Sequence, residues 1–362
     1  MKNIFYYINV PWDWIKQRPQ FIAEELAKDF RIEVFQEKNY HSKNLSSNHR
    51  KIQLTTLFRL PLSRFYFIKK LNDYLILLQL CFKIKRFDYI WLSSPLQYAT
   101  IKKIIKKDQF VIYDCMDDYF TFPEQQIDQI SLSIIKKNEP LLLQRANKVF
   151  CSSLNLKEKL ITRNQTIDKD KIYVVNNGIT IYSQEEEVSI PNEIREVFKK
   201  YPLNLCYIGT ISEWFDFQLL TNTIDKHENL ALILFGPIDI QLPKHERIIH
   251  LGAVPHQYIY GIMREAGVMI MPFLLNDLIY SVNPVKLYEY IYCKKIIIAR
   301  KYPEVLKFED YVYLYDNDAE FAELITNYCK KELSLKKEKE EYINFGFDNT
   351  WSERVKEFQL DI

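Results

Sequence analysis

Ser281-Val-Asn-Pro-Val-Lys-Leu-Tyr-Glu289 lies between two apolar runs, Val268-Met-Ile-Met-Pro272 and Ile296-Ile-Ile-Ala299. The short apolar runs are typical of buried strands, and the segment between them is typical of a loop that leads into a helix. Asn283 is a favourable N-cap residue and Pro284 suits the first helical position, so we expect the helix to begin there. The order strand, loop, helix, strand indicates a parallel α/β sheet.

The start of this predicted helix carries a lysine and a glutamate on one face. Backbone N–H groups at a helix start attract anions, and Lys286 adds a full positive charge. Glu289, three residues later, could accept hydrogen bonds from the hydroxyls of a ribose. Ligands of open parallel sheets collect outside the carboxyl ends of the strands, so this position suits a nucleotide diphosphate. The alternative is an ordinary surface ion pair, which contributes only about 0.2–0.5 kcal/mol.

Strand and helix patterns alternate along all 362 residues, a length that suits two domains. The acidic, proline-terminated stretch 183–191 is typical of a link, so domains are predicted at 1–182 and 183–349. Helices are predicted at 15–28, 98–107 and 351–360, among others. The predicted strands are 3–10, 31–36, 88–94, 110–115, 148–153, 172–177, 203–209, 231–236, 247–251, 268–271, 296–299 and 311–315.

The cysteines and the apolar runs indicate a cytoplasmic protein. Six cysteines are scattered without a Cys-x-x-Cys pair, as expected of free thiols in a reducing compartment. No run approaches the roughly 18 apolar residues of a membrane span, and the first ten residues lack the longer apolar core of a signal peptide.

The charge is distributed unevenly. Residues 1–180 hold 29 Lys and Arg against 18 Asp and Glu, whereas the remainder holds 20 against 29. Two interpretations of the basic half remain open: it rests on anionic lipid at the inner face of the membrane, or the apolar stretch 74–82 is a buried helix with solvated basic ends. Nucleic acid is not an expected partner because no recognition motif is present. The basic residues near this stretch are Arg59, Arg64, Lys69, Lys70, Lys83, Lys85, Arg86, Lys102, Lys103, Lys106 and Lys107.

Only seven glycines occur, and three of them close predicted strands. Gly209 and Gly236 each stand where a strand gives way to a loop, so the backbone there can approach a ligand closely. No Gly-x-Gly-x-x-Gly and no Walker sequence exists. A nicotinamide-dependent oxidoreductase and a P-loop kinase are therefore excluded.

Several segments together resemble the GT-B glycosyltransferases, in particular retaining family 4 and its relatives in bacterial polysaccharide and teichuronic acid assembly. The resemblance implies an α/β fold of two Rossmann-like, doubly wound parallel-sheet domains facing a central cleft. It also implies that a final helix, within 350–362, packs back on the N-terminal domain. The matching segments are Val10-Pro-Trp-Asp-Trp-Ile-Lys-Gln-Arg-Pro-Gln20, Tyr113-Asp-Cys-Met-Asp-Asp118, Asn176-Asn-Gly-Ile179, Tyr207-Ile-Gly-Thr-Ile-Ser-Glu-Trp-Phe-Asp216, Leu234-Phe-Gly-Pro237 and Asn283-Pro-Val-Lys-Leu-Tyr-Glu-Tyr290.

The resemblance implies a nucleotide diphosphate sugar, UDP- or GDP-linked, bound by the C-terminal domain. Lys286 would hold the diphosphate and stabilise its departure, and Glu289 would hold the ribose. No essential metal is expected, because in this fold lysine and the helix dipole manage the phosphate charge. The other residues implied at the donor site are Gly209, Thr210, Gly236, Pro237, Val254, Pro255, Tyr258 and Asn283.

Ser281 departs from the pattern, because relatives often carry a glutamate there, near the donor sugar. Contacts to the sugar would then come from Asp277, Asn283 or backbone groups.

The N-terminal domain would bind the acceptor. Asp117 and Asp118 follow a predicted buried strand, where one of them could act as a base for an acceptor hydroxyl or cap the next segment. Asp13 and Arg18, after the first strand, are predicted to contact the acceptor. The alternative for Arg18 is that it packs the entry of the first helix.

The sequence therefore predicts a hexosyltransferase, retaining by resemblance, that acts on a lipid-linked or oligosaccharide acceptor in cell-surface polysaccharide synthesis. Two alternatives remain: a GT-B-like sugar-nucleotide epimerase, which would need no acceptor, and a non-catalytic subunit of a polysaccharide assembly complex, which the serine at 281 favours.

Overall fold

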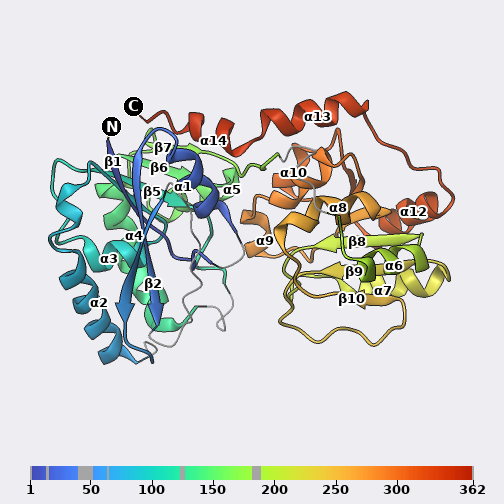
Figure 1. Cartoon of the computed structure of the whole chain (residues 1–362), viewed down its shortest axis with the longest axis horizontal. Coiled ribbons are helices and arrows are strands. Elements are labelled where there is room, and N and C mark those ends of the chain that lie inside the picture. Colours follow the sequence, from blue (N-terminus) through green and yellow to red (C-terminus); the bar gives the residue numbers. More distant parts are fainter. Residues whose placement is uncertain are drawn as a thin grey trace. The chain divides into compact units, whose positions relative to one another are not determined.

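The computed structural model describes residues 2–13, 16–39, 52–62, 65–122, 127–181 and 189–360. It divides into two compact units (Figure 1): Met1–Asn177 with Trp351–Ile362, and Gly178–Thr350. Arg64 and most of the predicted link 183–191 lie outside the described residues. Each unit is a parallel sheet flanked by helices, which confirms the predicted α/β class.

The first unit contains a seven-stranded sheet in the order β3-β2-β1-β4-β5-β6-β7, parallel throughout. The chain winds outward from β1 to β3, then crosses to the other side of β1 and continues to β7. The switch point therefore lies between β1 and β4. The strands are β1 Asn3–Tyr7, β2 Arg31–Asn39, β3 Gln53–Arg59, β4 Tyr89–Leu92, β5 Phe110–Cys115, β6 Lys148–Cys151 and β7 Ile172–Val174.

Successive residues of β1 serve opposite faces of this sheet, as the pleat of a strand requires. Phe5 and Tyr7 belong to one core cluster, and Ile4 and Tyr6 belong to another. The first cluster is covered by α2 Tyr66–Leu80, α3 Pro95–Ile101, α4 Gln129–Arg145 and α5 Leu154–Arg163. The second is covered by α1 Arg18–Leu26 and α14 Trp351–Glu357.

The end of the chain completes the second of these cores. The ring of Trp351 stacks on Phe21 of α1 with centroids 5.0 Å apart. Phe358, just after α14, is fully buried with its ring centroid 5.1 Å from that of Trp91 and 4.5 Å from that of Phe150. Aromatic contacts from the last residues therefore fill one face of the sheet that the first residues begin.

The second unit contains a six-stranded parallel sheet in the order β10-β9-β8-β11-β12-β13, built around one core. Here the switch point lies between β8 and β11. Its strands are β8 Asn204–Ile208, β9 Ala231–Phe235, β10 Ile248–His250, β11 Val268–Met271, β12 Ile296–Arg300 and β13 Tyr313–Tyr315. Its helices are α6 Asn192–Lys200, α7 Phe217–Lys226, η3 His256–Tyr258, α8 Ile259–Glu265, α9 Asp277–Ser281, α10 Val285–Tyr292, α11 Pro303–Leu306, α12 Asp318–Cys329 and α13 Lys339–Asp348.

Two predicted helices have other bounds in the structure. The helix predicted at 15–28 begins at Arg18. The one predicted at 98–107 is α3, which begins at Pro95 because the Ser94 hydroxyl accepts a hydrogen bond from the backbone N–H of Leu96. A serine cap followed by proline is a strong helix start that outweighs the apolar pattern further along.

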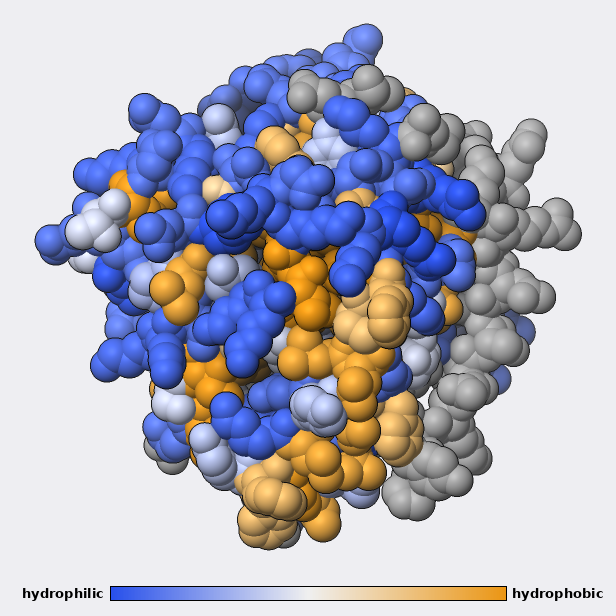
Figure 2. All heavy atoms as spheres, turned by 90° about the vertical axis from the view of Figure 1, so that its left-hand side faces the viewer, coloured by the Kyte–Doolittle hydropathy of each residue, from blue (hydrophilic) through white to orange (hydrophobic). Residues whose placement is uncertain are grey.

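The interpretation of 74–82 as a buried helix is wrong. The segment belongs mainly to α2, which buries only Asn72, Ile76 and Leu80. The side chains of Tyr74 and Leu78 point to solvent instead. Figure 2 shows this side of the molecule, where hydrophobic side chains gather on the surface.

Candidate functional site

The switch point of the second sheet defines a candidate ligand site at the carboxyl ends of β8 and β11. The donor residues predicted from the sequence follow these strands or their neighbours. Gly209 and Thr210 follow β8, Gly236 and Pro237 follow β9, and the segment 252–258 follows β10. Thr210 is exposed, and Pro237, Val254 and Tyr258 are partly exposed. All of them stand at one edge of the sheet.

Gly209 and Gly236 are in close backbone contact at this edge. A Cβ atom at position 236 would lie 2.0 Å from the carbonyl oxygen of Gly209, and Gly236 has a φ of +127°. The backbone N–H of Gly236 donates to the carbonyl of Gly252 at 2.8 Å, and His250 Nε2 lies 2.8 Å from the Gly236 carbonyl oxygen. Side chains are excluded here, so the loops after β8 and β9 are held together by backbone.

Replacing Gly236 with alanine should lower the free energy of unfolding by about 2 kcal/mol or more, since the new methyl group collides with backbone and the φ is unfavourable. Urea denaturation measures this. Gly252→Ala is the control: that glycine also has a positive φ, +74°, but a Cβ there meets no atom within 4 Å. It should cost only about 1 kcal/mol. Equal losses for the two variants would contradict the close-contact explanation.

Helix α10 stands beside the same edge and carries the predicted Lys286 and Glu289. Lys286 Nζ lies 2.9 Å from Glu289 Oε2, with 28% of the lysine side chain exposed and only 7% of the glutamate. The helix is fixed to β8 by Tyr290, whose hydroxyl oxygen accepts a hydrogen bond from the Ile208 backbone N–H at 3.1 Å. The Glu289 carboxylate is too deeply buried for an ordinary surface ion pair. The free-energy cost of removing it from water must be offset by specific contacts.

The predicted helix start was wrong by one residue. The helix begins at Val285 and its N-cap residue is Pro284, which has no side chain to cap with. Asn283 is buried instead, and its Nδ2 lies 3.4 Å from the Tyr288 hydroxyl and from Glu304 Oε2. The backbone of Pro284 is extended, with φ −80° and ψ 93°, so the helix begins one residue later and Asn283 lies in the interior.

Ser281, where the resemblance described above implies a glutamate, stands at the end of α9. It is buried, and its hydroxyl donates to the backbone carbonyl of Asp277 at 3.2 Å. The Ser281 hydroxyl is therefore hydrogen-bonded within α9, and position 281 supplies no carboxylate to this edge of the sheet.

The first sheet also has polar groups at its switch point, after β1, β4 and β5. Asn9 Nδ2 donates to the Tyr119 hydroxyl oxygen at 2.8 Å, and that hydroxyl donates to the Ser93 carbonyl at 3.0 Å. Asp13 lies in the loop after β1 and is partly exposed. Neither Asn9 nor Tyr119 could be selected from the sequence, because only the strand order brings the ends of β1, β4 and β5 to one edge of the sheet.

Asp117 and Asp118 differ sharply although they are adjacent. Asp118 is 2% exposed and is paired with Arg163 at 2.9 Å and Lys159 at 3.4 Å. As a whole residue Asp117 is partly exposed, and its carboxylate has no hydrogen-bond or ion-pair partner among the described residues. Burial raises the pKa of Asp117 to about 6, with Arg18 opposing this and Asp114 and Asp118 adding to it. Of the two, Asp117 is the carboxylate available to a ligand.

For Arg18 the structure favours the packing interpretation over contact with an acceptor. Its side chain is 4% exposed, and Nη2 lies 2.9 Å from Oδ1 of the fully buried Asp114. Nη1 donates to the carbonyls of Val175 at 2.8 Å and Asn176 at 3.1 Å. Removing one partner of such a buried pair leaves an uncompensated charge, so Arg18 fixes the strand ends around Asp117.

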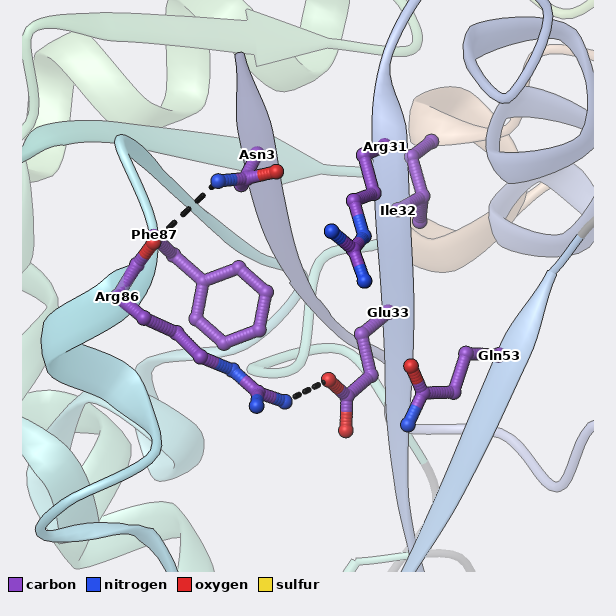
Figure 3. Close-up of a pocket in the computed structure, with 7 residues that line it drawn as sticks. All are labelled: Asn3, Arg31, Ile32, Glu33, Gln53, Arg86 and Phe87. Atoms are coloured by element: carbon purple, nitrogen blue, oxygen red, sulfur yellow. Dashed lines mark hydrogen bonds and ion pairs between the residues drawn. The ribbon is translucent and has the colours of Figure 1, made fainter. Parts of the chain in front are cut away.

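A surface pocket of about 260 Å³ lies at the opposite edge of the first sheet, at the amino ends of β1 and β2. Figure 3 shows its lining, with the Arg86 guanidinium paired to Glu33 and Asn3 Nδ2 donating to the Arg86 carbonyl. Parallel sheets bind ligands at the carboxyl edge, and none of the candidate residues lines this pocket. The remaining lining residues are Arg31, Ile32, Gln53 and Phe87.

Within the described ranges, no group of three or more His, Cys, Asp or Glu side chains is arranged to hold a metal ion. In the same part of the chain, no helix combines the length and the apolar character needed to cross a membrane.

Three solved structures resemble the chain over nearly its whole length. HepE from Anabaena in complex with UDP-glucose has a TM-score of 0.71 and 12% identity, covering 99% of both chains. Sucrose-phosphate synthase from Thermosynechococcus elongatus has a TM-score of 0.72 and 14% identity, covering 99% of this chain and 97% of that one. An E. coli trehalose-6-phosphate protein bound with UDP-2-fluoro glucose has a TM-score of 0.73 and 10% identity, covering 99% and 100%. The chain has the GT-B fold, as its sequence segments predict.

In sequence, the chain is similar to TuaH of Bacillus subtilis (strain 168). The name of that protein describes it as a glycosyltransferase of teichuronic acid biosynthesis. The two are 24% identical over 238 residues, which cover 62% of this chain and 59% of TuaH. The match therefore spans less than two thirds of that relative's length. No family model matches the chain.

Proposed function

We propose that the chain is a glycosyltransferase that moves a hexosyl group from a nucleotide diphosphate sugar to a hydroxyl of a lipid-linked or oligosaccharide acceptor in cell-surface polysaccharide synthesis. The observation that carries the proposal is the Lys286–Glu289 pair at the switch-point edge of a GT-B sheet. UDP is preferred to GDP as the carrier, because two of the solved structures that resemble the chain hold a UDP-sugar. The similarity to TuaH supports the same class of reaction.

The donor side of the reaction is assigned to Lys286 and the start of α10. The bond between the anomeric carbon and the diphosphate oxygen breaks, and the diphosphate keeps the bonding electrons. Positive charge aimed at this oxygen stabilises the transition state more than the bound substrate, which is what accelerates the step. Glu289 would accept hydrogen bonds from the ribose. Gly209, Thr210, Gly236, Pro237, Val254, Tyr258 and Asn283 would line the rest of the donor site.

The acceptor side is assigned to Asp117, and Asp13, on the loop after β1, is assigned as a second contact to the acceptor. The acceptor oxygen forms the new bond to the anomeric carbon on the face from which the diphosphate departs, as retention in a single displacement requires. Its proton passes to the Asp117 carboxylate. A carboxylate with a pKa of about 6 is ionised at neutral pH and still basic enough for this task. Retention of the anomeric configuration and membership of family 4 rest on resemblance.

We also propose peripheral contact with the inner face of the cell membrane, where a lipid-linked acceptor would be found. The excess of positive charge in residues 1–180 supports this, since that face of the bilayer is anionic.

The test begins with thermal unfolding in the presence of UDP, GDP, ADP, CMP and their common sugar conjugates. A ligand at about 100 times its Kd adds about 2.7 kcal/mol, which raises the Tm of a domain the size of the second unit by roughly 5 to 10 °C. The responding UDP-sugar is then incubated with candidate acceptors while UDP release is followed. Release that depends on acceptor supports the transferase. Conversion of the sugar without acceptor indicates an epimerase, and binding without turnover indicates a non-catalytic subunit.

A further inference from the structure

Helix α2 has apolar side chains on its outward face in addition to Ile76 and Leu80, which it buries in the core. Its polar residues are bound to the protein: the Asn72 amide exchanges two hydrogen bonds with the Leu60 backbone, at 2.7 and 3.0 Å. Gln79 does the same with the Phe58 backbone, at 2.9 and 3.0 Å. Asp73 accepts from the Thr100 hydroxyl at 3.0 Å. These bonds fix which face of α2 is turned outward, at the edge of the sheet beside β3.

The outward face of α2 carries an apolar stripe, defined by Phe67, Leu71, Tyr74, Leu78 and, just after the helix, Phe82. The spacing of three and four residues places them on one side of the helix. Their exposed fractions run from 37% for Leu71 to 83% for Phe82. Figure 2 shows hydrophobic side chains gathered on this side of the molecule. A stripe of this size on the surface marks an interaction site.

Lysines accompany the apolar stripe. Lys70 lies over the Tyr66 ring at 5.6 Å, and Lys85 lies over the Phe82 ring at the same distance. Lys106 donates to the Lys85 backbone carbonyl at 3.0 Å, which joins a third lysine to the end of the stripe. Residues 65–87 contain five basic residues and a single acidic one, Asp73, which is turned to Thr100.

We propose that the apolar stripe of α2 and its lysines bind the surface of an anionic lipid bilayer. Phenylalanine, tyrosine and leucine side chains suit the boundary between headgroups and acyl chains, while long lysines reach the anionic headgroups. A second copy of the chain suits this surface less well, because a two-fold interface would place two positively charged patches against each other. A bilayer supplies both the apolar layer and the opposite charge.

The experiment is sedimentation of the protein with vesicles of phosphatidylcholine alone or with about 30 mol% phosphatidylglycerol, without donor or acceptor. We expect sedimentation with the anionic vesicles and loss of most of it in about 0.5 M salt. Phe67→Asp combined with Phe82→Asp should reduce the partition coefficient at least tenfold. Both side chains are mostly exposed, so the Tm should be unchanged. Phe347→Asp, at an exposed phenylalanine of α13, is the control that should sediment as the unaltered protein does.

Failure to bind anionic vesicles, or equal binding by the double variant, would overturn this proposal. A dimer in solution that the double variant abolishes, without vesicle binding, would assign the stripe to a second copy instead. Because no sugar nucleotide is present, the result does not depend on the proposed transfer. Transfer to a soluble acceptor should be unaffected by the double variant, so loss of lipid binding and loss of catalysis are distinguishable.

Discussion

Lys286→Ala should lower sugar transfer by roughly 10²-fold or more. The variant removes the charge proposed to stabilise the departing diphosphate, and loss of a single preorganised contact to a developing negative charge costs about 10²–10³ in kcat. It also leaves Glu289, 7% exposed, without its ion-pair partner. The measurements are kcat and KM for UDP release, and the thermal shift given by UDP.

Lys307→Ala provides a matched control. Lys307 Nζ lies 2.9 Å from Glu304 Oε2, again with a spacing of three residues, and the side chains are 34% and 6% exposed. Both variants break a lysine pair with a buried glutamate, so they should lower stability to a similar degree. Only Lys286→Ala should abolish the shift given by UDP. An equal loss of transfer in the two variants would contradict the assignment. It would mean that activity is lost because a buried glutamate has no ion-pair partner, and not because the diphosphate has lost its contact with Lys286.

Asp117→Asn should make the protein more stable at pH 7.5 and nearly inactive. The folded-state pKa of about 6 is higher than the ordinary 3.8, so the folded state binds this proton more tightly than the unfolded state. The ionised carboxylate therefore destabilises the fold above pH 6, and the effect disappears below about pH 4. Two pKa units correspond to up to roughly 3 kcal/mol, which asparagine recovers. Loss of a general base lowers the rate by about 10²–10⁴.

The pH dependence of kcat/KM and of the Tm tests this. In the unaltered protein the rate should fall as the pH drops through about 6, and the Tm advantage of Asp117→Asn should vanish at pH 4. Asp118→Asn is the contrasting variant: it weakens the ion pairs with Arg163 and Lys159, so the Tm should fall. Full activity in Asp117→Asn would remove this carboxylate from the reaction.

The buried strands could be predicted from the sequence more accurately than the edge strands. The bounds of β5 and β11 are as predicted, because β11 is a continuous apolar run and β5 is interrupted only by Asp114. The edge strand β3 was missed: Gln53-Leu-Thr-Thr-Leu-Phe-Arg59 buries only Leu57 and lacks such a run. At an edge, a partner strand rather than composition decides the structure.

In the candidate site, too, local contacts could be predicted from the sequence and long-range contacts could not. Lys286 and Glu289 could be found because a spacing of three on a helix fixes which side chains meet. The difference between Asp117 and Asp118 could not, because it depends on Arg163 and Lys159, which are more than 40 positions away in sequence. For Arg18 the sequence left two interpretations open for the same reason: its partner Asp114 is 96 residues away.

The return of the chain to its first unit sets an order for biosynthesis. Phe358 and Trp351 pack against Trp91, Phe150 and Phe21, yet a ribosome makes them only after residues 178–350. While residues 178–350 are being made, α1 alone of the two helices α1 and α14 can cover this face of the first sheet. The second unit, continuous in sequence, can finish folding before the first. Of the two units, the one that begins first along the chain is therefore completed second, and its incompletely covered apolar surface is exposed for longer.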